Sequence, residues 1–329
     1  MTAPLLNTFH APQAERLASK LPSISVVVPV YNSEQTLEML IERLLPVLSK
    51  ISSLYEVIFV NDGSRDQSGS VARRLSQAFP FLTVIELMRN YGQHNALLAG
   101  IRRARYEILI TLDDDLQNPP EEIPRLLAGL TEGVDVVYGV PAIEQHGLLR
   151  DLASQVTKLT LQNAMGAETA RHISAFRIFR TGLREAFSEY RGSFVSIDVL
   201  LTWATTRFSA VIVRHEPRHA GPSNYTVRKL IFHAINLMTG FSTLPLQLAS
   251  LIGFAFTVIG FLILLFVLGR YAIDGGSVPG FPFLASIIAL FSGAQMFALG
   301  IIGEYLARVH FRMMDKPPYA VRETIGNGA

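Results

Sequence analysis

Short apolar runs alternate with amphipathic stretches from Ser23 to about residue 140. The runs are rich in valine and isoleucine and end in polar or glycine-containing turns, which is typical of strands buried on both faces of a parallel sheet. We predict strands at 24–30, 55–60, 82–87, 108–112 and 134–140, with helices at about 35–49, 67–79, 95–104 and 121–132. This alternation predicts an α/β fold with a mostly parallel, doubly wound, Rossmann-like sheet.

The last hundred residues follow a different pattern. Residues 244–268 and 275–303 carry no charged side chain, and each run is long enough for the roughly 20 residues that a membrane span needs. We therefore predict a transmembrane hairpin with spans at about 244–268 and 283–302. Residues 227–242 mix cationic and apolar side chains, which is typical of an interfacial helix. The alternative, a pair of buried core helices, is uncommon at this length and apolarity.

Charges flanking the hairpin predict its orientation. Basic residues stand before it and after it, whereas the short intervening loop holds one basic and one acidic residue: Arg228 and Lys229 before, Arg308, Arg312 and Lys316 after, Arg270 and Asp274 between. By the positive-inside rule both ends of the chain are cytoplasmic. The predicted units are a tail (1–22), a catalytic domain (23–225), an interfacial helix (226–243), the hairpin (244–305) and a cytoplasmic tail (306–329).

Composition narrows the possible functions. Hydrophobic residues make up 49% of the 329, and the mean hydropathy of +0.31 is high for a soluble protein. The net charge of +2 gives no argument for nucleic acid as a partner. The chain has no cysteine, which excludes disulfides, thiolate metal sites and a cysteine nucleophile. The first 21 residues lack the apolar core of a cleaved signal peptide.

An acidic cluster follows the strand at 108–112. Side chains alternate along a strand, so Asp113 and Asp115 are expected on one side and Asp114 on the other, with Gln117 joining the first pair if the extended course continues. Two carboxylates and an amide oxygen suit Mg²⁺ or Mn²⁺. The alternative is a solvated acidic turn that caps the next helix.

Other strands of the predicted sheet also end in polar residues, where open α/β sheets bind their ligands. Asn61 and Asp62 are candidates to accept a hydrogen bond from a base or a ribose hydroxyl, although an ordinary turn would have the same sequence. Arg89 is a candidate partner for a phosphate or simply a surface charge. The segment containing Pro29, Tyr31 and Asn32 frames a nucleobase or only terminates its strand.

Taken in this order and spacing, these motifs resemble family 2 glycosyltransferases of the GT-A fold. The resemblance is strongest to the bacterial polyprenyl-phosphate glycosyltransferases. Dolichyl-phosphate mannose synthase belongs to the same group. It rests on residues 89–94 (Arg-Asn-Tyr-Gly-Gln-His), on residues 115–126 and on Gly303-Glu304-Tyr305, and it covers nearly the whole chain from Ser23. Departures from the family pattern include Asn61 in place of an aspartate and Ala175 where relatives have an acidic residue.

The resemblance implies an inverting, metal-dependent hexosyl or pentosyl transferase. Its donor would be a UDP-sugar or GDP-sugar, its acceptor undecaprenyl phosphate, and its product a lipid-linked sugar for the cell envelope. Donor binding would involve the strand-end residues above with Gln93 and Asp114, and the metal would be held by Asp113, Asp115 and Gln117. The protein would be a homo-oligomer, such as a tetramer, in the bacterial inner membrane.

The acceptor phosphate requires cations, and guanidinium groups match phosphate bidentately. The candidates are Arg177, Arg218, Ser223, Tyr225 and Lys229. Asp198 lies near where GT-A enzymes keep a catalytic base, and the alternative is an ordinary helix-start aspartate. Residues 318–325 alternate like an edge strand that could add to a neighbouring subunit.

Three rival functions share some of these features. A processive polysaccharide synthase shares the aspartates but would carry a Gln-x-x-Arg-Trp motif and more spans. A nucleotidyltransferase could use the same sheet and metal without needing the hairpin. A catalytically silent membrane scaffold would have no use for intact Asp113, Asp115 and Gln117.

Overall fold

A computed structural model describes residues 21–142, 173–192, 195–217, 244–274 and 280–326. Its centre is an eight-stranded sheet in the order β7-β5-β6-β4-β1-β2-β3-β8. All of these strands are parallel except β6 and β8. The strands are β1 (Ile24–Val30), β2 (Tyr55–Asn61), β3 (Leu82–Leu87), β4 (Ile108–Thr111), β5 (Val136–Pro141), β6 (Arg177–Arg180), β7 (Phe208–Val213) and β8 (Val321–Ile325). The prediction of a mostly parallel α/β sheet is confirmed.

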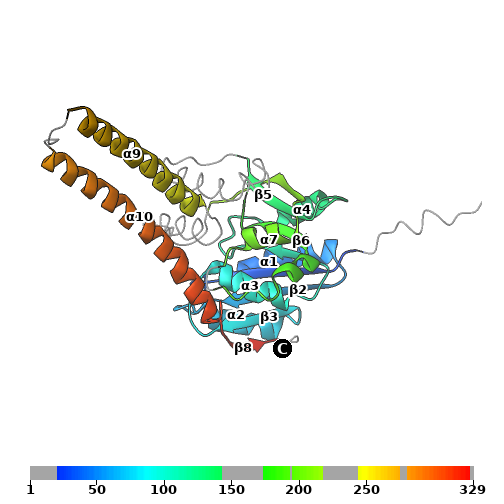
Figure 1. The fold of residues 1–329 in the computed structure, drawn as a ribbon. Helices are drawn as coiled ribbons and strands as arrows, with labels where there is room; N and C mark the ends of the chain where they lie inside the picture. The colour runs from blue at the N-terminus through cyan, green and yellow to red at the C-terminus, as the bar shows by residue number, and fades with distance from the viewer. Residues whose placement is uncertain (1–20, 143–172, 193–194, 218–243, 275–279, 327–329) are drawn as a thin grey trace, which may run out of the picture.

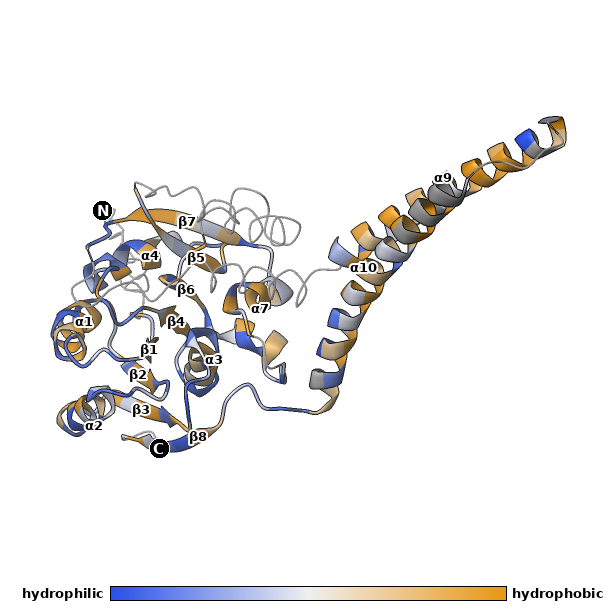
Figure 2. Cartoon of the chain, turned by 90° about the vertical axis from the view of Figure 1, so that its left-hand side faces the viewer, coloured by the Kyte–Doolittle hydropathy of each residue, from blue (hydrophilic) through white to orange (hydrophobic). Residues whose placement is uncertain are grey.

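Helices cover both faces of the sheet (Figure 2). In the described part of the catalytic domain the α-helices are α1 (Leu37–Ile51), α2 (Ser68–Ala78), α3 (Gln93–Arg103), α4 (Ile123–Gly129) and α7 (Ile197–Ala204). The first, second and fourth pack on one face, and α3 and α7 pack on the other. Every residue of β1 is buried between these layers, which explains its continuous apolar sequence.

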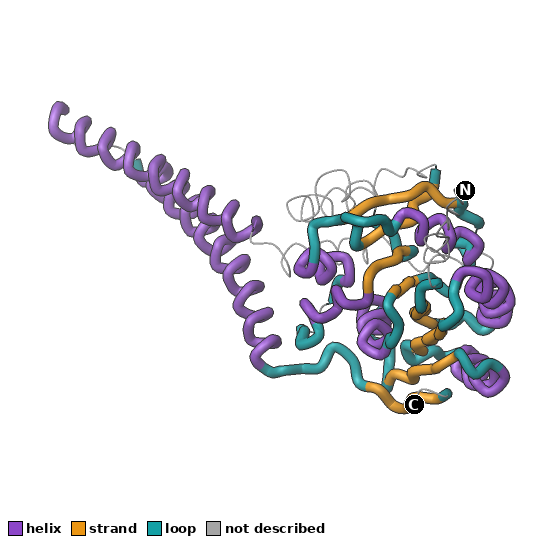
Figure 3. The backbone as a smooth tube through the Cα atoms, turned by 90° about the vertical axis from the view of Figure 1, so that its right-hand side faces the viewer, coloured by secondary structure: helices purple, strands orange, loops and turns teal. Residues whose placement is uncertain are grey.

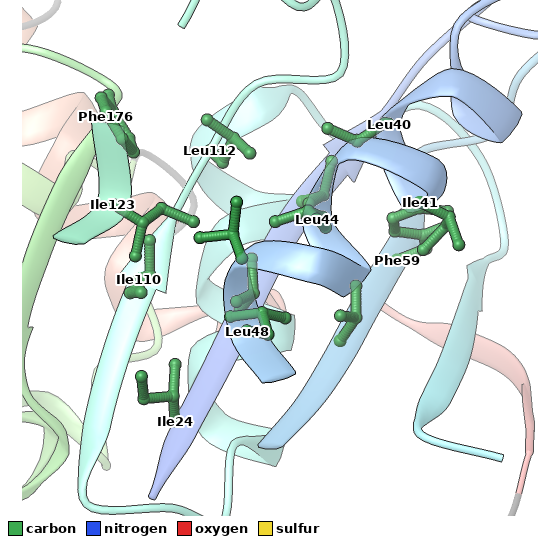
Figure 4. Packing of buried hydrophobic residues seen from close by; sticks show 14 of the residues in the cluster. Ile24, Leu40, Ile41, Leu44, Leu48, Phe59, Ile110, Leu112, Ile123 and Phe176 are labelled. Carbon is green, nitrogen blue, oxygen red and sulfur yellow. The ribbon is translucent and has the colours of Figure 1, made fainter. Parts of the chain in front are cut away.

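The two cores differ in how closely helix and sheet approach. On one face, Leu40, Leu44 and Leu48 of α1 point toward Ile24 and Ile110 of the central strands (Figure 4). On the other face α3 lies so near β1 that a Cβ on Gly100 would be 2.3 Å from Val27 Cγ1. A larger residue there would push α3 away from the strands that it covers.

Two predicted elements differ in the structure. The helix expected at 121–132 is a 3-10 turn (Pro120–Glu122) followed by the short α4, because Pro119, Pro120 and Pro124 restrict the backbone there. The edge strand expected at residues 318–325 is the shorter β8, which pairs antiparallel with β3 of its own chain and is the last strand of the sheet. Strands β6 and β7 and the 3-10 segment Thr181–Phe187 were not predicted.

Two long helices, α9 (Leu244–Asp274) and α10 (Phe281–Met313), extend away from the sheet (Figures 1 and 3). Within them, residues 245–270 and 290–310 are predominantly apolar and largely exposed, with mean hydropathies of 2.9 and 1.3. By length and composition both are able to cross a membrane. They contact each other through Phe256 and Phe291, whose rings meet edge-on at 5.5 Å.

The hairpin is connected to opposite edges of the sheet. The chain leaves from the end of β7 at one edge, and it returns through β8 at the other. Since β7 is parallel to its neighbour, it ends at the carboxyl edge of the sheet. The first residue of β8, Val321, pairs with Leu87, the last residue of β3. Thus β7 ends, and β8 begins, on the side of the sheet where the parallel strands end.

Candidate active site

A cavity of about 520 Å³ opens at the carboxyl edge of the sheet. Its lining comes from the ends of β1, β2 and β4, the segment before β6, and the first turns of α3 and α7. Ten of the predicted site residues line it: Pro29, Tyr31, Asp62, Gln93, Asp113, Asp114, Asp115, Gln117, Arg177 and Asp198. The structure thus brings together residues that are up to 169 positions apart in the chain, from Pro29 to Asp198.

The acidic cluster forms a turn and does not continue the strand. β4 ends at Thr111, and buried Leu116 has a left-handed backbone with φ of 61°. The Gln117 amide then donates to Asp115 Oδ1 at 3.1 Å. The sequence analysis expected Gln117 beside Asp113 and Asp115 if the extended strand continued. Gln117 does line the cavity, but the turn places it there. Asp114 also lines the cavity, but its carboxylate is bonded to the loop after β1, whereas Asp113 is bonded to α3.

The first two aspartates have different partners. Asp113 Oδ1 accepts from Gln93 Nε2 at 2.7 Å, at the start of α3. Asp114 Oδ2 accepts from the Tyr31 amide at 3.1 Å and from Ser33 Oγ. Burial raises the pKa of Asp114 to about 6, and these hydrogen bonds oppose the shift. Asp114 therefore holds the loop after β1 against the acidic turn.

Asp62 links the ends of β2 and β3. Its two carboxylate oxygens accept from the backbone amides of Tyr91 and Gly92 at 2.7 and 2.8 Å. Burial raises its pKa to about 6 in spite of these hydrogen bonds. The next residue, Gly63, has φ of +64°, and a Cβ on it would be 2.6 Å from the Arg89 carbonyl carbon. Only glycine allows the two loops to approach this closely.

Arg177, Asp198 and Tyr138 form a buried polar cluster beside the cavity. Arg177 is 1% exposed, forms an ion pair with Asp198, and donates through Nε to Thr111 Oγ1 at 3.1 Å. Tyr138 Oη donates to Asp198 Oδ1 at 3.0 Å. Burial and the neighbouring Asp198 raise the pKa of Tyr138 well above its ordinary value, so the phenol stays protonated. The charge of Arg177 is therefore balanced within the protein, a role for Asp198 that neither sequence interpretation anticipated.

Three predicted residues are not brought to the cavity. The side chain of Asn61 donates to Glu86 Oε2 at 2.7 Å and accepts from Ser64, so it braces its own turn. Asn32 Oδ1 accepts from the Arg65 amide at 2.8 Å. Arg89 is exposed, with its guanidinium over the Tyr91 ring at 4.6 Å. Four others, Arg218, Ser223, Tyr225 and Lys229, lie outside the described residues.

The cavity also has lining residues that the sequence analysis did not select. Asn90, Gly92 and His94 follow β3, and the same strand-end argument could have found them. The Ile197 amide donates to His94 Nδ1 at 3.3 Å, so a neutral ring would carry its proton on Nε2. Ile173, Ser174 and Ala175 precede β6, a strand with no clear sequence signal, and so gave no such indication.

The lining has a strong excess of negative charge. Among the described residues that line the cavity, five are aspartates and one is an arginine, which is already paired: Asp62, Asp113, Asp114, Asp115 and Asp198, with Arg177. Carboxylate and amide oxygens are the ligands that hard divalent cations prefer, so this donor set fits a metal such as Mg²⁺ or Mn²⁺. Among the described residues, no three acidic or histidine side chains converge tightly enough to form a metal site alone. An ion here would complete its coordination with Gln117, water or substrate.

Comparison with known proteins decides the family. The family model described as "Glycosyl transferase family 2" matches residues 25–191. The chain belongs to glycosyl transferase family 2. It is 36% identical over 308 residues to the undecaprenyl-phosphate 4-deoxy-4-formamido-L-arabinose transferase of Pectobacterium atrosepticum, covering 93% of this chain and 94% of that one. It is 35% identical over 312 residues to the transferase of the same name from Yersinia enterocolitica, covering 94% and 95%.

Solved structures support the fold of this glycosyltransferase. Glucosyl-3-phosphoglycerate synthase from Mycobacterium tuberculosis, solved with Mn²⁺, uridine diphosphate and glucosyl-3-phosphoglycerate, matches with a TM-score of 0.50. The match covers 72% of this chain and 86% of that chain at 20% identity. At this identity the likeness shows the fold alone. The sheet is of the GT-A type, followed here by the two apolar helices α9 and α10.

Proposed function

We propose that this protein transfers a sugar from a nucleotide sugar, UDP-linked, to undecaprenyl phosphate. One structural observation supports this most directly. The acidic cavity, the end of β7 and the start of β8 lie at the same carboxyl edge of the sheet, and these two strands precede and follow the apolar hairpin in the chain. A donor held at the strand ends would therefore face the side from which a lipid phosphate must approach. The relatives named above, similar over nearly the whole chain, are transferases of undecaprenyl phosphate.

The donor would bind at the ends of β1, β2 and β4. Asp62 would accept from the nucleoside, and Asp113, Asp115 and Gln117 would hold a divalent cation. When bound, that cation would supply neutralising charge for the departing nucleoside diphosphate. The negative lining supports this proposal, because the diphosphate would otherwise meet several carboxylates and one arginine whose charge is already balanced.

The acceptor explains why the site needs no strong base. A phosphate monoester has a second pKa of about 6, so the acceptor is mostly a dianion at neutral pH. It is able to attack the anomeric carbon directly, with inversion. The protein's task is to hold two anionic substrates in line. Asp198 is engaged by Arg177 and Tyr138, which agrees with a site where proton abstraction is not required.

Cations for the acceptor phosphate remain a proposal from the sequence. Arg218, Ser223, Tyr225 and Lys229 stand between the catalytic domain and the first apolar helix, where the phosphate of a membrane lipid would emerge. Arg177 would contribute less than predicted, because its guanidinium already pairs with Asp198. We propose that α9 and α10 cross the bacterial inner membrane and that both chain ends are cytoplasmic.

We also propose that the protein forms homo-oligomers, such as a tetramer, through its membrane helices. Small residues on the apolar helices, such as Ala249 and Gly253, favour close helix association. β8 is the last strand of its sheet, so its outer edge is a second candidate surface for pairing with a neighbouring subunit. A monomeric mass by native mass spectrometry in mild detergent would reject it.

A direct assay tests the main proposal. Purified protein would be mixed with undecaprenyl phosphate, Mn²⁺ or Mg²⁺, and a panel of UDP-sugars and GDP-sugars, and the lipid phase scored for sugar. We expect one sugar to appear in that phase as a single residue per lipid. Longer saccharides on the lipid would favour a processive synthase. Absence of transfer with every donor, while a nucleoside diphosphate still binds, would reject the acceptor.

A further inference from the structure

A network of ion pairs joins segments that are far apart in the sequence. Arg43, on α1, forms a two-pronged pair with Glu121, with Nε to Oε1 at 2.9 Å and Nη2 to Oε2 at 2.8 Å. It forms a second such pair with Glu216, with Nη1 to Oε2 at 3.0 Å and Nη2 to Oε1 at 3.1 Å. Glu121 follows the acidic turn by six positions, and Glu216 follows the last residue of β7 by three. One guanidinium therefore bridges both segments to α1.

A backbone hydrogen bond joins the same two segments directly. The Glu216 amide donates to the Gln117 carbonyl oxygen at 2.8 Å, next to the side chain proposed to hold the metal. A second set of contacts, made by Glu122 and Arg125, also joins these two segments. Glu122 pairs with Arg214 at 2.6 Å and with Arg125 at 3.2 Å, and Arg125 also donates to the Ile212 carbonyl. The segment after β7 is thus held to the turn after β4 at three points.

Arg43 is suited to this position by its geometry. A planar guanidinium can make two parallel hydrogen bonds to each of two carboxylates, whereas a lysine ammonium is a single point charge. The side chain of Arg43 is 25% exposed, so it is less open to solvent than ordinary surface pairs. The hydrogen bonds that Arg43 donates to Glu121 and Glu216 raise the pKa of its guanidinium further above its already high ordinary value. The pairs therefore persist at any physiological pH.

We propose that Arg43 is a positioning residue for sugar transfer. It fixes the segment 214–217, through which the chain passes from the catalytic domain toward the first apolar helix, against the turn that carries Gln117. It touches neither substrate and acts through Glu121 and Glu216. This inference rests on the proposed function, because it assigns to Arg43 the alignment of the membrane-side acceptor with the donor site.

The test compares Arg43→Ala with a matched control, Arg74→Ala. Like Arg43, Arg74 forms an ion pair with a glutamate, in this case Glu38 of α1. Both side chains of that pair are more exposed than those of the Arg43 pairs, and neither lines the cavity. We expect Arg43→Ala to raise the KM for undecaprenyl phosphate at least tenfold. Binding of uridine diphosphate with Mn²⁺, measured by calorimetry, should change less than threefold. Arg74→Ala should change neither quantity.

Hydrogen exchange supplies a readout that does not depend on activity. Loss of Arg43 should raise the exchange rate of the Glu216 amide at least tenfold, because its bond to Gln117 loses its support. Amides of β1 and β2 should keep their protection, which separates a local change from general destabilisation. Arg43→Lys keeps the positive charge but cannot form the two bidentate pairs with Glu121 and Glu216. It is expected to reproduce most of the rise in acceptor KM and most of the rise in Glu216 exchange.

The possible results separate the two proposals. If wild-type protein transfers sugar but Arg43→Ala leaves both the acceptor KM and Glu216 exchange unchanged, Arg43 is only a surface charge and the inference fails. If nucleotide binding falls as much as acceptor binding, Arg43 supports the metal turn and not the acceptor side, which also overturns it. If wild-type protein transfers no sugar, the proposed function fails, and this assignment to transfer fails with it. Exchange at Glu216 then tests only the structural link.

Discussion

The Arg177–Asp198 pair gives the sharpest test of how the site is built. The perturbations are Arg177→Met, Asp198→Leu and the double variant Arg177→Met/Asp198→Leu. Both wild-type side chains are nearly fully buried, and no other ion pair to either is found in the described part of the chain. Removing one partner leaves a buried charge without its counter-ion, which costs about 3–5 kcal/mol. Replacing both with apolar groups removes that penalty.

The double variant should therefore be much less damaged than the sum of the single variants. Its remaining cost comes mainly from Tyr138, whose hydroxyl donates to Asp198 and would lose its acceptor, at about 1–3 kcal/mol. Additivity would predict a loss of about 6–10 kcal/mol, so we expect a coupling energy above about 3 kcal/mol. For a domain of this size each kcal/mol shifts the unfolding temperature by about 2–4 °C, so each single variant should lower it by about 6–20 °C.

The assay is thermal unfolding in detergent at one fixed scan rate, with nucleotide binding measured on the same samples. Trp203, the only tryptophan, is 47% exposed in α7 and reports the unfolding of the helix that carries Asp198. A double variant that recovers stability and nucleotide binding but not transfer would give the pair a direct role in the reaction. A double variant whose loss of unfolding temperature equals the sum of the single losses would refute the buried-pair reasoning.

Three further predictions follow from the site. Asp115→Asn should abolish transfer with folding intact, and excess EDTA should stop the wild-type enzyme; continued turnover in EDTA would contradict the metal assignment. Burial raises the pKa of Asp62 to about 6, so donor binding should weaken as the pH falls through 6 and the carboxylate gains a proton. Calorimetry at pH 5 to 8 would measure this dependence of donor affinity on pH, which should disappear in Asp62→Asn. Gly63→Ala should lower the unfolding temperature more than Gly133→Ala, because both have positive φ but only the first would place its Cβ against backbone, and equal losses would remove the steric argument.

Much of the catalytic fold is determined locally by the sequence. The valine- and isoleucine-rich runs are buried on both faces, so their periodicity alone identified β1 to β5 to within a few residues. Asp62 and Asp115 follow such strands, and parallel strands end at one edge, so their convergence followed from topology. The two apolar helices could also be predicted from the sequence, because uncharged stretches of that length are typical of helices able to span a membrane.

Contacts between distant segments were decided only by the tertiary structure. Arg43 and Glu216 are 173 positions apart, and nothing in either neighbourhood indicates the other. Strand β6 begins with a buried arginine, Arg177. A hydrophobicity pattern predicts that an arginine is exposed, and only the ion pair with Asp198 explains its burial. The acidic residues form a turn because β4 stops at Thr111, and the rule of alternating side chains holds only while a strand lasts.

The placement of β8 illustrates the same division. Its alternating sequence predicted an edge strand at residues 318–325, and the structure has a strand at 321–325 at the edge of the sheet. The sequence left open which sheet it would join. In the structure the hairpin returns the chain beside the free edge of β3, where pairing within the chain needs no second molecule. The local pattern determined the strand, and the path of the chain through space selected its partner.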